Sequence, residues 1–498
     1  MAESNTPVPT LTSLSDSILA SGTFNQHTHI NQNRYTRRGE RPGCARLLEN
    51  IAPAAFHDSG HDPPKCHSNT RVAIMQCITD WAVGRDAELS GKPILWLKGA
   101  AGTGKSAIAR NMADRCSEEG LLLGTFFFRG ADSTRNHVGQ LVATLSYQIC
   151  RVLPEFLDTV ATFIEDDPLI FGRSIRTQIS TLIIRPLSAI LANGSTTSST
   201  TPRLIIIDGL DECSDVNSQQ DLLLILQEVT STTNLIRFLV CSRPESHLNK
   251  TFSLSHMVPN IYKIFLDHDY AASHDIWVYL QDKFKQIKEG HSFKHLLPDP
   301  WPTPRMVCDL VEKASGQFIY AATVVRYVES SSHRPDERLN AIFQLRPPFK
   351  DLPFTELDAL YRLIISKAED LPTVLDILAF PALYGFFPVQ DIEAILQLGR
   401  GGVEVLLADL HSIITIDNDG DVKFLHKSLV DFLSEPQRAG DLYRDLSKTR
   451  LSHVARVISI FSIFSGTSTL WPTNKICLLL KEYYTPHNSR SFVRTQEF

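Results

Sequence analysis

The chain has 498 residues, of which 43% are apolar and 21% are charged, and its formal net charge is −6. These values are those of a globular protein with two to four domains, and they exclude a fibrous or wholly disordered chain. The acidic balance also lacks the positive charge of a nucleic-acid-binding surface, so we expect no nucleic-acid partner.

Cysteine usage and hydropathy predict a cytoplasmic protein. The nine cysteines include no CxxC pair, which fits a reducing compartment better than a disulfide framework. The polar start "MAESNTPVPTLTSLSDS" lacks the basic and apolar regions of a secretory signal. No apolar run reaches the ~20 residues of a membrane helix, so we predict no membrane span.

The first 60 residues are rich in Ser, Thr, Asn, Pro and His, and we predict that residues 1–60 are largely disordered, with a short helix in "CARLLENIAPAAF". From about residue 66 to residue 260, apolar strand patterns alternate with helical ones, which predicts a mostly parallel sheet. The predicted strands are "PILWL" (93–97), "TFFFRG" (125–130), "RLIIID" (203–208) and "IRFLVCS" (236–242).

Strand signals fade after about residue 268, and amphipathic helices follow at "IWVYLQDKFKQI" and "ASGQFIYAATVVRYVES". The proline-rich "PPFKDLPF" (347–354) marks the start of a new unit. Within that unit, "HSIITID" and "VKFLHKS" flank the turn signal "NDGD", which predicts a hairpin after helices. We therefore predict a helical domain over 266–346, a winged-helix-like domain over 347–440 and a helical tail over 441–498.

The segment "GAAGTGKS" follows a predicted strand and opens a predicted helix, which is the context of a phosphate-binding P-loop. Glycines allow the loop to wrap closely around a phosphate, and its N–H groups and the helix N-terminus face the anion. The lysine is expected to reach the β- and γ-phosphates, and the serine to bind Mg²⁺. The expected cofactor-binding residues are Gly99, Ala100, Ala101, Gly102, Thr103, Gly104, Lys105 and Ser106.

The stretch "IIIDGLDEC" places three carboxylates within five residues at the end of a buried strand. At ~4 Å and an effective dielectric constant near 20, each like-charge pair costs on the order of 4 kcal/mol, so the fold needs a compensating charge. A P-loop protein supplies it as a metal ion, and we expect Asp208 to hold Mg²⁺. Asp211 and Glu212 are then candidates for polarising the attacking water.

Arg243 follows the strand "FLVCS", next to the predicted acidic strand end. A cation at this place is suited to sensing the γ-phosphate. The alternative is a plain surface arginine before Pro244, and the sequence does not decide between the two.

Together these segments resemble the NACHT family of signalling P-loop NTPases (STAND type), in its fungal and nephrocystin-type branch. The resemblance covers about residues 60–440 and rests on "GAAGTGKS" and "LIIIDGLDEC". The supporting segments are "PPKCHSNTR", "TFFFRG", "LVCSRPE", "SGQFIYAATVVRYV" and "KFLHKSLVDFL".

The resemblance implies a nucleotide-binding domain over 61–265, with an α/β P-loop NTPase fold of a parallel sheet flanked by helices. It also implies an NLR-like switch that is closed with ADP, opens with ATP and Mg²⁺, hydrolyses slowly and forms a homo-oligomer when open. Thr70 and Arg71 would lie near the base, Arg243 would sense the γ-phosphate, and His426 would contact the β-phosphate. From the residues alone, a lone histidine such as His426 is more often an ordinary structural or surface residue than a ligand.

Two other functions remain open on the sequence. One is a steady-state ATPase that acts on a partner, and the other is a scaffold that holds nucleotide without hydrolysing it. ATP and GTP are not distinguished by any residue. Neither the trigger nor the protein partners can be read from the chain.

Overall fold

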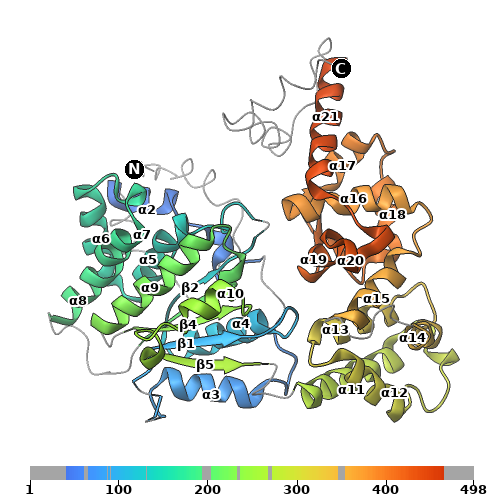
Figure 1. Cartoon of the computed structure of the whole chain (residues 1–498), viewed down its shortest axis with the longest axis horizontal. Helices are drawn as coiled ribbons and strands as arrows, with labels where there is room; N and C mark the ends of the chain where they lie inside the picture. The colour runs from blue at the N-terminus through green and yellow to red at the C-terminus, as the bar shows by residue number, and fades with distance from the viewer. Residues whose placement is uncertain are drawn as a thin grey trace, which may run out of the picture.

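The computed structural model describes residues 41–60, 65–86, 88–89, 91–130, 132–192, 203–232, 236–266, 272–345 and 354–464. The predictions for residues 1–40 and for the tail after Phe464 lie outside these residues. The described chain forms an α/β lobe, blue to green in Figure 1, and a mainly helical lobe, yellow to red, beside it.

The α/β lobe is built on a five-stranded sheet with the order β2-β3-β4-β1-β5, in which all neighbouring strands are parallel. Its strands are β1 (Ile94–Lys98), β2 (Leu122–Phe127), β3 (Arg203–Asp208), β4 (Ile236–Ser242) and β5 (Ile261–Phe265). The central strands are buried on both faces, which is why they are continuous apolar runs rather than alternating ones. This is the predicted P-loop α/β fold.

Helices cover both faces of the sheet, so each face has its own apolar core. Leu95, Leu97 and Leu239 face α3 (Val72–Ala82) and α4 (Lys105–Glu118). Ile94, Trp96 and Ile205 share the other core with the remaining helices. Those helices are α2 (Pro42–Glu49), α5 (Leu141–Val152), α6 (Pro154–Asp166), α7 (Ile175–Ile179), α8 (Arg185–Ala192), α9 (Val216–Thr232) and α10 (Ser246–Thr251).

The edge strand β5 was not predicted, and β2 begins earlier than predicted. β5 lies at the end of the sheet and pairs only with β1, so its polar and apolar residues are mixed in the sequence "IYKIF". The start of β2 contains Gly124, and glycine weakens a strand signal.

Residues 41–60 fold onto the α/β lobe, and α2 overlaps the short helix that the sequence predicts in "CARLLENIAPAAF". Helix α2 packs on α6, where the Arg41 Nε donates to Glu165 at 3.0 Å and the Gly43 N–H donates to the same carboxylate at 3.2 Å. Cys44, Leu47 and Ala55 are buried in the core.

The fit of α2 against α6 predicts an unusual response to substitution at Gly43. A Cβ at Gly43 would lie 2.3 Å from the backbone oxygen of Ala161, so Gly43→Ala must push the two helices apart. We expect Gly43→Ala to lower the free energy of unfolding by about 1–3 kcal/mol, although alanine normally favours a helix. Thermal and urea unfolding measure the change.

Gly172→Ala is the matched control, because nothing lies within 4 Å of a Cβ at Gly172. If Gly43→Ala is as stable as this control or more stable than the wild type, the close packing of α2 on α6 is wrong.

The second lobe begins with a group of four helices and continues into a unit with a small antiparallel sheet. The first group is α11 (Ser273–Gly290), α12 (Pro304–Ala314), α13 (Phe318–Val328) and α14 (Pro335–Phe343). The following helices are α15 (Thr355–Ile365), α16 (Leu371–Tyr384), α17 (Val389–Leu396), α18 (Gly402–Leu407), α19 (Ser428–Ser434), α20 (Pro436–Ala439) and α21 (Leu446–Phe464). The sheet has the order β6-β8-β7, with β6 (Phe386–Pro388), β7 (Ile414–Ile416) and β8 (Asp421–Phe424).

The predicted hairpin is present as the antiparallel pair β7 and β8, and Gly420 in its turn has φ of 78°. The winged-helix-like arrangement and the domain boundaries at residues 265, 346 and 440 stay predictions of domain organisation.

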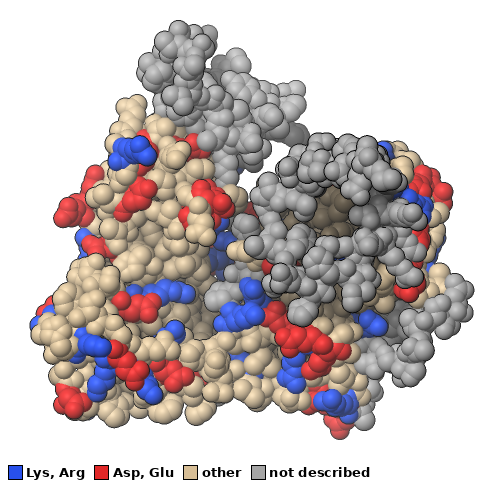
Figure 2. All heavy atoms as spheres, turned by 180° about the vertical axis from the view of Figure 1, so that it is seen from behind, with Lys and Arg blue, Asp and Glu red and all other residues tan. Residues whose placement is uncertain are grey.

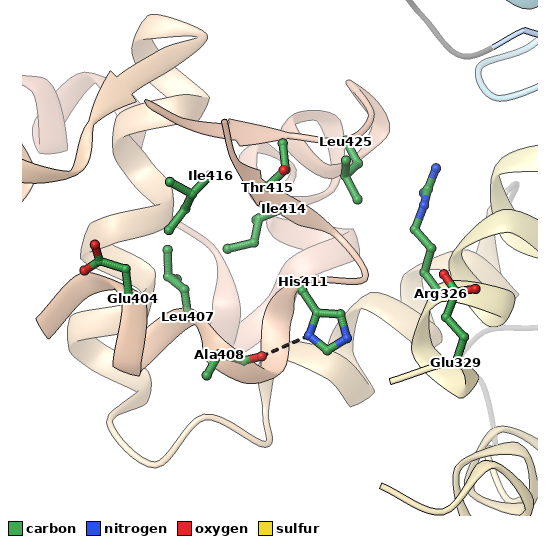
Figure 3. A pocket seen from close by; sticks show the side chains of 10 residues that line it. All are labelled: Arg326, Glu329, Glu404, Leu407, Ala408, His411, Ile414, Thr415, Ile416 and Leu425. Atoms are coloured by element: carbon green, nitrogen blue, oxygen red, sulfur yellow. Dashed lines mark hydrogen bonds between the residues drawn. The ribbon is translucent and has the colours of Figure 1, made fainter. Parts of the chain in front are cut away.

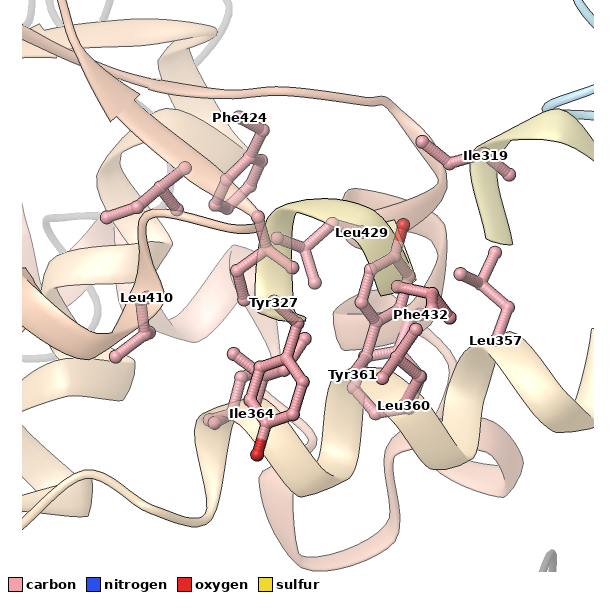
Figure 4. Packing of buried hydrophobic residues seen from close by; sticks show 14 of the residues in the cluster. Ile319, Tyr327, Leu357, Leu360, Tyr361, Ile364, Leu410, Phe424, Leu429 and Phe432 are labelled. Carbon is pink, nitrogen blue, oxygen red and sulfur yellow. The ribbon is translucent and has the colours of Figure 1, made fainter. Parts of the chain in front are cut away.

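The helices and the small sheet of the second lobe share one apolar core. Figure 4 shows Tyr327 of α13 and Leu360 of α15 next to Leu410, Phe424 and Phe432 from the unit with the small sheet. All five side chains are buried. The second lobe is therefore continuously packed from α11 to the start of α21.

The surface is mixed in charge. On the face shown in Figure 2, Lys and Arg are interspersed with Asp and Glu, with no extended region of one sign. Within the described residues, no helix combines the length and the apolarity needed to cross a membrane.

Candidate functional site

The loop from Gly99 to Ser106 connects β1 to α4 at the carboxyl edge of the sheet, where ligands of open α/β folds bind. Gly102 and Gly104 have φ of 78° and 93°, a left-handed conformation that favours glycine. A Cβ at Gly102 would lie 2.1 Å from the Ile319 side chain. The Ile319 N–H also donates to the Gly102 carbonyl at 3.3 Å, so α13 begins directly on this loop.

Lys105 lies over the loop. Its Nζ donates to the carbonyls of Gly99 and Ala100, at 2.8 Å each. Burial lowers the pKa of Lys105, while the nearby carboxylates of Asp211 and Asp208 act in the opposite direction. The Lys105 ammonium group therefore lies close to the place where the loop N–H groups would hold an anion.

Asp208 ends β3 beneath the loop and is buried. Burial raises the pKa of Asp208 to about 7, against the effects of a hydrogen bond from Ser106 and the charge of Lys105. Its Oδ1 is buried and has no hydrogen-bond partner in the described chain. A carboxylate with a vacant buried oxygen beside a serine hydroxyl fits Mg²⁺, which takes oxygen ligands and keeps several waters.

Asp211 and Glu212 lie in a 3-10 turn after Gly209, which has φ of 69°. Asp211 accepts a hydrogen bond from the Arg243 N–H at 3.0 Å. Glu212 accepts from the Gly130 N–H at 2.9 Å and lies 3.6 Å from Lys427. The repulsion that the sequence predicts is therefore offset by protein cations and N–H groups at Asp211 and Glu212, whereas one buried oxygen of Asp208 has no hydrogen-bond partner in the described chain.

Arg243 joins the two lobes. Its Nε lies 3.4 Å from Asp211 of the α/β lobe, and its Nη1 donates to Asp431 of α19 at 2.9 Å. The Asp431 and Asp211 charges raise the pKa of Arg243 against the effect of burial. Arg243 is thus an ion-paired residue at the lobe interface rather than a plain surface arginine.

His426 lies against the loop from the other lobe, with its Cε1 3.9 Å from where a Cβ of Gly102 would be. The Ser428 N–H donates to His426 Nδ1 at 3.1 Å, and Tyr361 and Ser428 share a hydroxyl hydrogen bond at 2.8 Å. Because Nδ1 accepts a hydrogen bond, the neutral ring carries its proton on Nε2. Burial lowers the pKa of His426 to about 3, so the ring is a neutral hydrogen-bond donor.

Thr70 and Arg71 lie at the start of α3, at the junction with the second lobe. The Arg71 Nη2 donates to the Thr103 carbonyl at 2.7 Å, and its guanidinium lies 4.9 Å from the centre of the Phe318 ring. The Arg71 N–H donates to Asp275 of α11 at 3.1 Å, whereas Thr70 donates to the His67 carbonyl at 2.6 Å. The structure therefore brings all the predicted site residues to one edge of the sheet.

Sequence reasoning missed three contributors from the second lobe: Ile319, Lys427 and Asp431. Lys427 and Asp431 follow the candidate His426 by one and five residues in "HKSLVD". This closeness in sequence was the signal that could have identified them. Their roles depend on how the lobes meet, which no local pattern encodes.

This α/β lobe, with its P-loop between β1 and α4 and its acidic turn after β3, has the fold of a P-loop NTPase. Residues 76–243 match the family described as "Nephrocystin 3, N-terminal". The match begins within α3 and ends at Arg243, and it confirms the predicted nephrocystin-type resemblance for this segment.

Two solved structures are similar to a large part of the chain. A Walker-type ATPase of Pyrococcus abyssi is 14% identical, covers 74% of this chain and 97% of its own, and has a TM-score of 0.38. The ORC2 protein of Aeropyrum pernix, in ADPNP–ADP complexes, is 13% identical, covers 83% and 100%, and has a TM-score of 0.35. No curated protein matches. With these TM-scores, the function has to be argued from the site itself.

The depressed pKa of His426 predicts a pH dependence. Below its ordinary value of 6.5, the unfolded chain binds a proton at His426 that the folded chain does not bind until about pH 3. The contribution of His426 to the free energy of unfolding is therefore complete above pH ~6.5 and is lost as the pH falls toward 3. Between pH ~7 and ~5 we expect the wild type to lose about 1–2 kcal/mol more than His426→Gln in urea unfolding.

The comparison with His426→Gln cancels the effects of other titrating groups. The charged groups that act on His426 are Arg243, Lys105, Arg326 and Lys427, all of which oppose its protonation. Equal pH slopes for the two proteins would mean that His426 is not held neutral at the loop.

Proposed function

We propose that the chain is a nucleotide-dependent signalling switch, described here in its closed form. The observation that carries the proposal is the position of Arg243, which pairs at once with Asp211 of the acidic turn and with Asp431 of α19. Arg243, the proposed γ-phosphate sensor, is therefore already part of an interaction between the lobes. Binding of a triphosphate has to compete with that interaction, and so has to affect how the lobes meet.

The proposed ligand is ATP or ADP with Mg²⁺. The N–H groups of residues 99–106 would hold the phosphates, and Lys105 would turn from its two carbonyl partners to the phosphate oxygens. Ser106 and Asp208 would hold the metal ion, whose charge would offset phosphate charge. His426 would donate from Nε2 to the β-phosphate, and Thr70 and Arg71 would lie near the base.

Slow hydrolysis follows from the state of the acidic turn. Asp211 is engaged by Arg243, and Glu212 by the Gly130 N–H and Lys427. Both carboxylates are held in these contacts while the second lobe is docked, which limits how they can orient a water. We infer that the closed form turns over far more slowly than the ~1–100 s⁻¹ of kinases, and that opening exposes the surfaces that form an oligomer.

The first experiment is to identify the nucleotide that the purified chain carries. The protein is denatured, and the released nucleotide is separated by chromatography, for the wild type and for Lys105→Ala. We expect about one ADP per chain in the wild type and a loss of at least ~10-fold in Lys105→Ala, because a buried charge-assisted contact is removed.

Lys98→Ala is the control, since Lys98 lies one residue before the loop over the rings of Trp96 and Phe265. Wild-type protein that is empty and binds no added ATP or ADP would contradict the proposal. Rapid steady-state hydrolysis would favour an ATPase that acts on a partner. Retention of nucleotide with no change in oligomer state for Glu212→Gln would favour a scaffold.

Asp431→Asn tests the interaction between the lobes. It removes the charge that holds Arg243 while keeping the size of the side chain, so we expect fluorescently labelled ADP to dissociate about 10-fold faster, equivalent to about 1.4 kcal/mol. A larger oligomeric fraction in the presence of ATP should accompany the faster release, measured by size-exclusion chromatography with light scattering.

Asp419→Asn is the charge-matched control, because Asp419 is an exposed residue of the β7–β8 turn. An ADP release rate for Asp431→Asn equal to that of Asp419→Asn would show that this ion pair does not hold the closed form.

A further inference from the structure

A solvent-open hollow of about 510 Å³ lies in the second lobe. One side is α13 with the residue after it, and the other is formed by α18, β7 and the end of β8. The lining residues are Arg326, Glu329, Glu404, Leu407, Ala408, His411, Ile414, Thr415, Ile416 and Leu425. Figure 3 shows these side chains around the hollow, and none of them belongs to the nucleotide site proposed above.

Arg326 is the unusual member of the lining. Its Nη1 is buried and has no hydrogen-bond partner within the described residues, and the residue as a whole is half-buried. Most buried charges are paired, because an unpaired one loses its hydration without compensation. In Figure 3 the Arg326 side chain extends from α13 to the level of Leu425, at the edge of the hollow.

The wall opposite Arg326 is apolar. Leu407, Ile414 and Ile416 belong to the core-forming elements α18 and β7, and in Figure 3 they line the middle of the hollow. Glu404 lies at the far end, and Glu329, which follows the last residue of α13, lies next to Arg326. A cation at one end, an apolar middle and a carboxylate at the far end disfavour a polyanion and suit a ligand with a single negative charge.

His411 adds a polar group beside the apolar wall. Its Nδ1 lies 2.9 Å from the Ala408 carbonyl and donates to it, as drawn in Figure 3. In the neutral ring this leaves Nε2 as an acceptor at the side of the hollow that faces α13. A ligand hydroxyl or a water is the matching partner there.

We propose that this cavity binds a small amphipathic monocarboxylate, with the carboxylate on Arg326 and an apolar body along Leu407, Ile414 and Ile416. The guanidinium offers two parallel N–H groups to a carboxylate, and the volume is that of an ordinary small-molecule site. This proposal does not depend on nucleotide binding, because no residue of the nucleotide site lines the cavity.

The test is calorimetric titration of the full chain with octanoate, kept below its micellar concentration. We expect saturable binding of one octanoate per chain, no saturable binding of octylamine, and weakening of octanoate by about 10-fold or more in Arg326→Gln, because a charge-assisted contact is lost. Acetate should bind at least ~10-fold more weakly than octanoate, since it lacks the apolar body.

Two further variants separate a loss of octanoate binding from a loss of folding. Ala408→Leu fills the hollow from an exposed position and should abolish octanoate binding while leaving the melting temperature near that of the wild type. Arg400→Gln removes an exposed arginine outside the cavity and should bind octanoate as the wild type does. The proposal is overturned if the wild type shows no saturable octanoate binding, or if Arg326→Gln and Ala408→Leu bind octanoate as tightly as Arg400→Gln.

Discussion

The contact of Arg243 with both Asp211 and Asp431 is the interaction on which the arrangement of the site depends. It joins the acidic turn after β3 to the first turn of α19, two segments that are about 220 residues apart in sequence but share one guanidinium. A pair of this kind is weak when fully exposed, but here both carboxylates and the guanidinium are largely shielded from solvent. The same docking brings Lys427 to Glu212 and the His426 ring to the P-loop.

The charges at the site divide into those that the protein compensates and those that it leaves for a ligand. Asp211, Glu212 and Arg243 are compensated by one another and by Asp431, Lys427 and a backbone N–H. Asp208 keeps a buried oxygen without a hydrogen bond, and its pKa rises to about 7, because burial outweighs the hydrogen bond from Ser106. Asp208 is therefore the least compensated of the three carboxylates, which is the physical reason for proposing a metal ion there.

The sequence was informative where local chemistry determines the structure. Continuous apolar runs identified β1, β3 and β4 within a residue of their ends, because buried parallel strands leave no room for polar alternation. The P-loop and the acidic turn were found because glycine, lysine and carboxylate spacings reflect phosphate and metal chemistry directly. β5 was missed because an edge strand depends on tertiary contacts, here its pairing with β1, for its stability.

The partners of Arg243 and His426 lie beyond what local patterns encode, and the reason is physical. In the sequence, Asp431 is an ordinary charged residue of a short helix. Only the contact between the two lobes places it 2.9 Å from Arg243. His426 becomes a neutral donor only because Ser428, Tyr361 and the P-loop enclose it, since an exposed histidine would share its proton between two tautomers and be partly charged. A switch requires this dependence: groups that acquire their chemistry only when two lobes meet lose it when the lobes part. In the proposed switch, these contacts between the lobes would be the ones that convert a change of nucleotide into a change of shape.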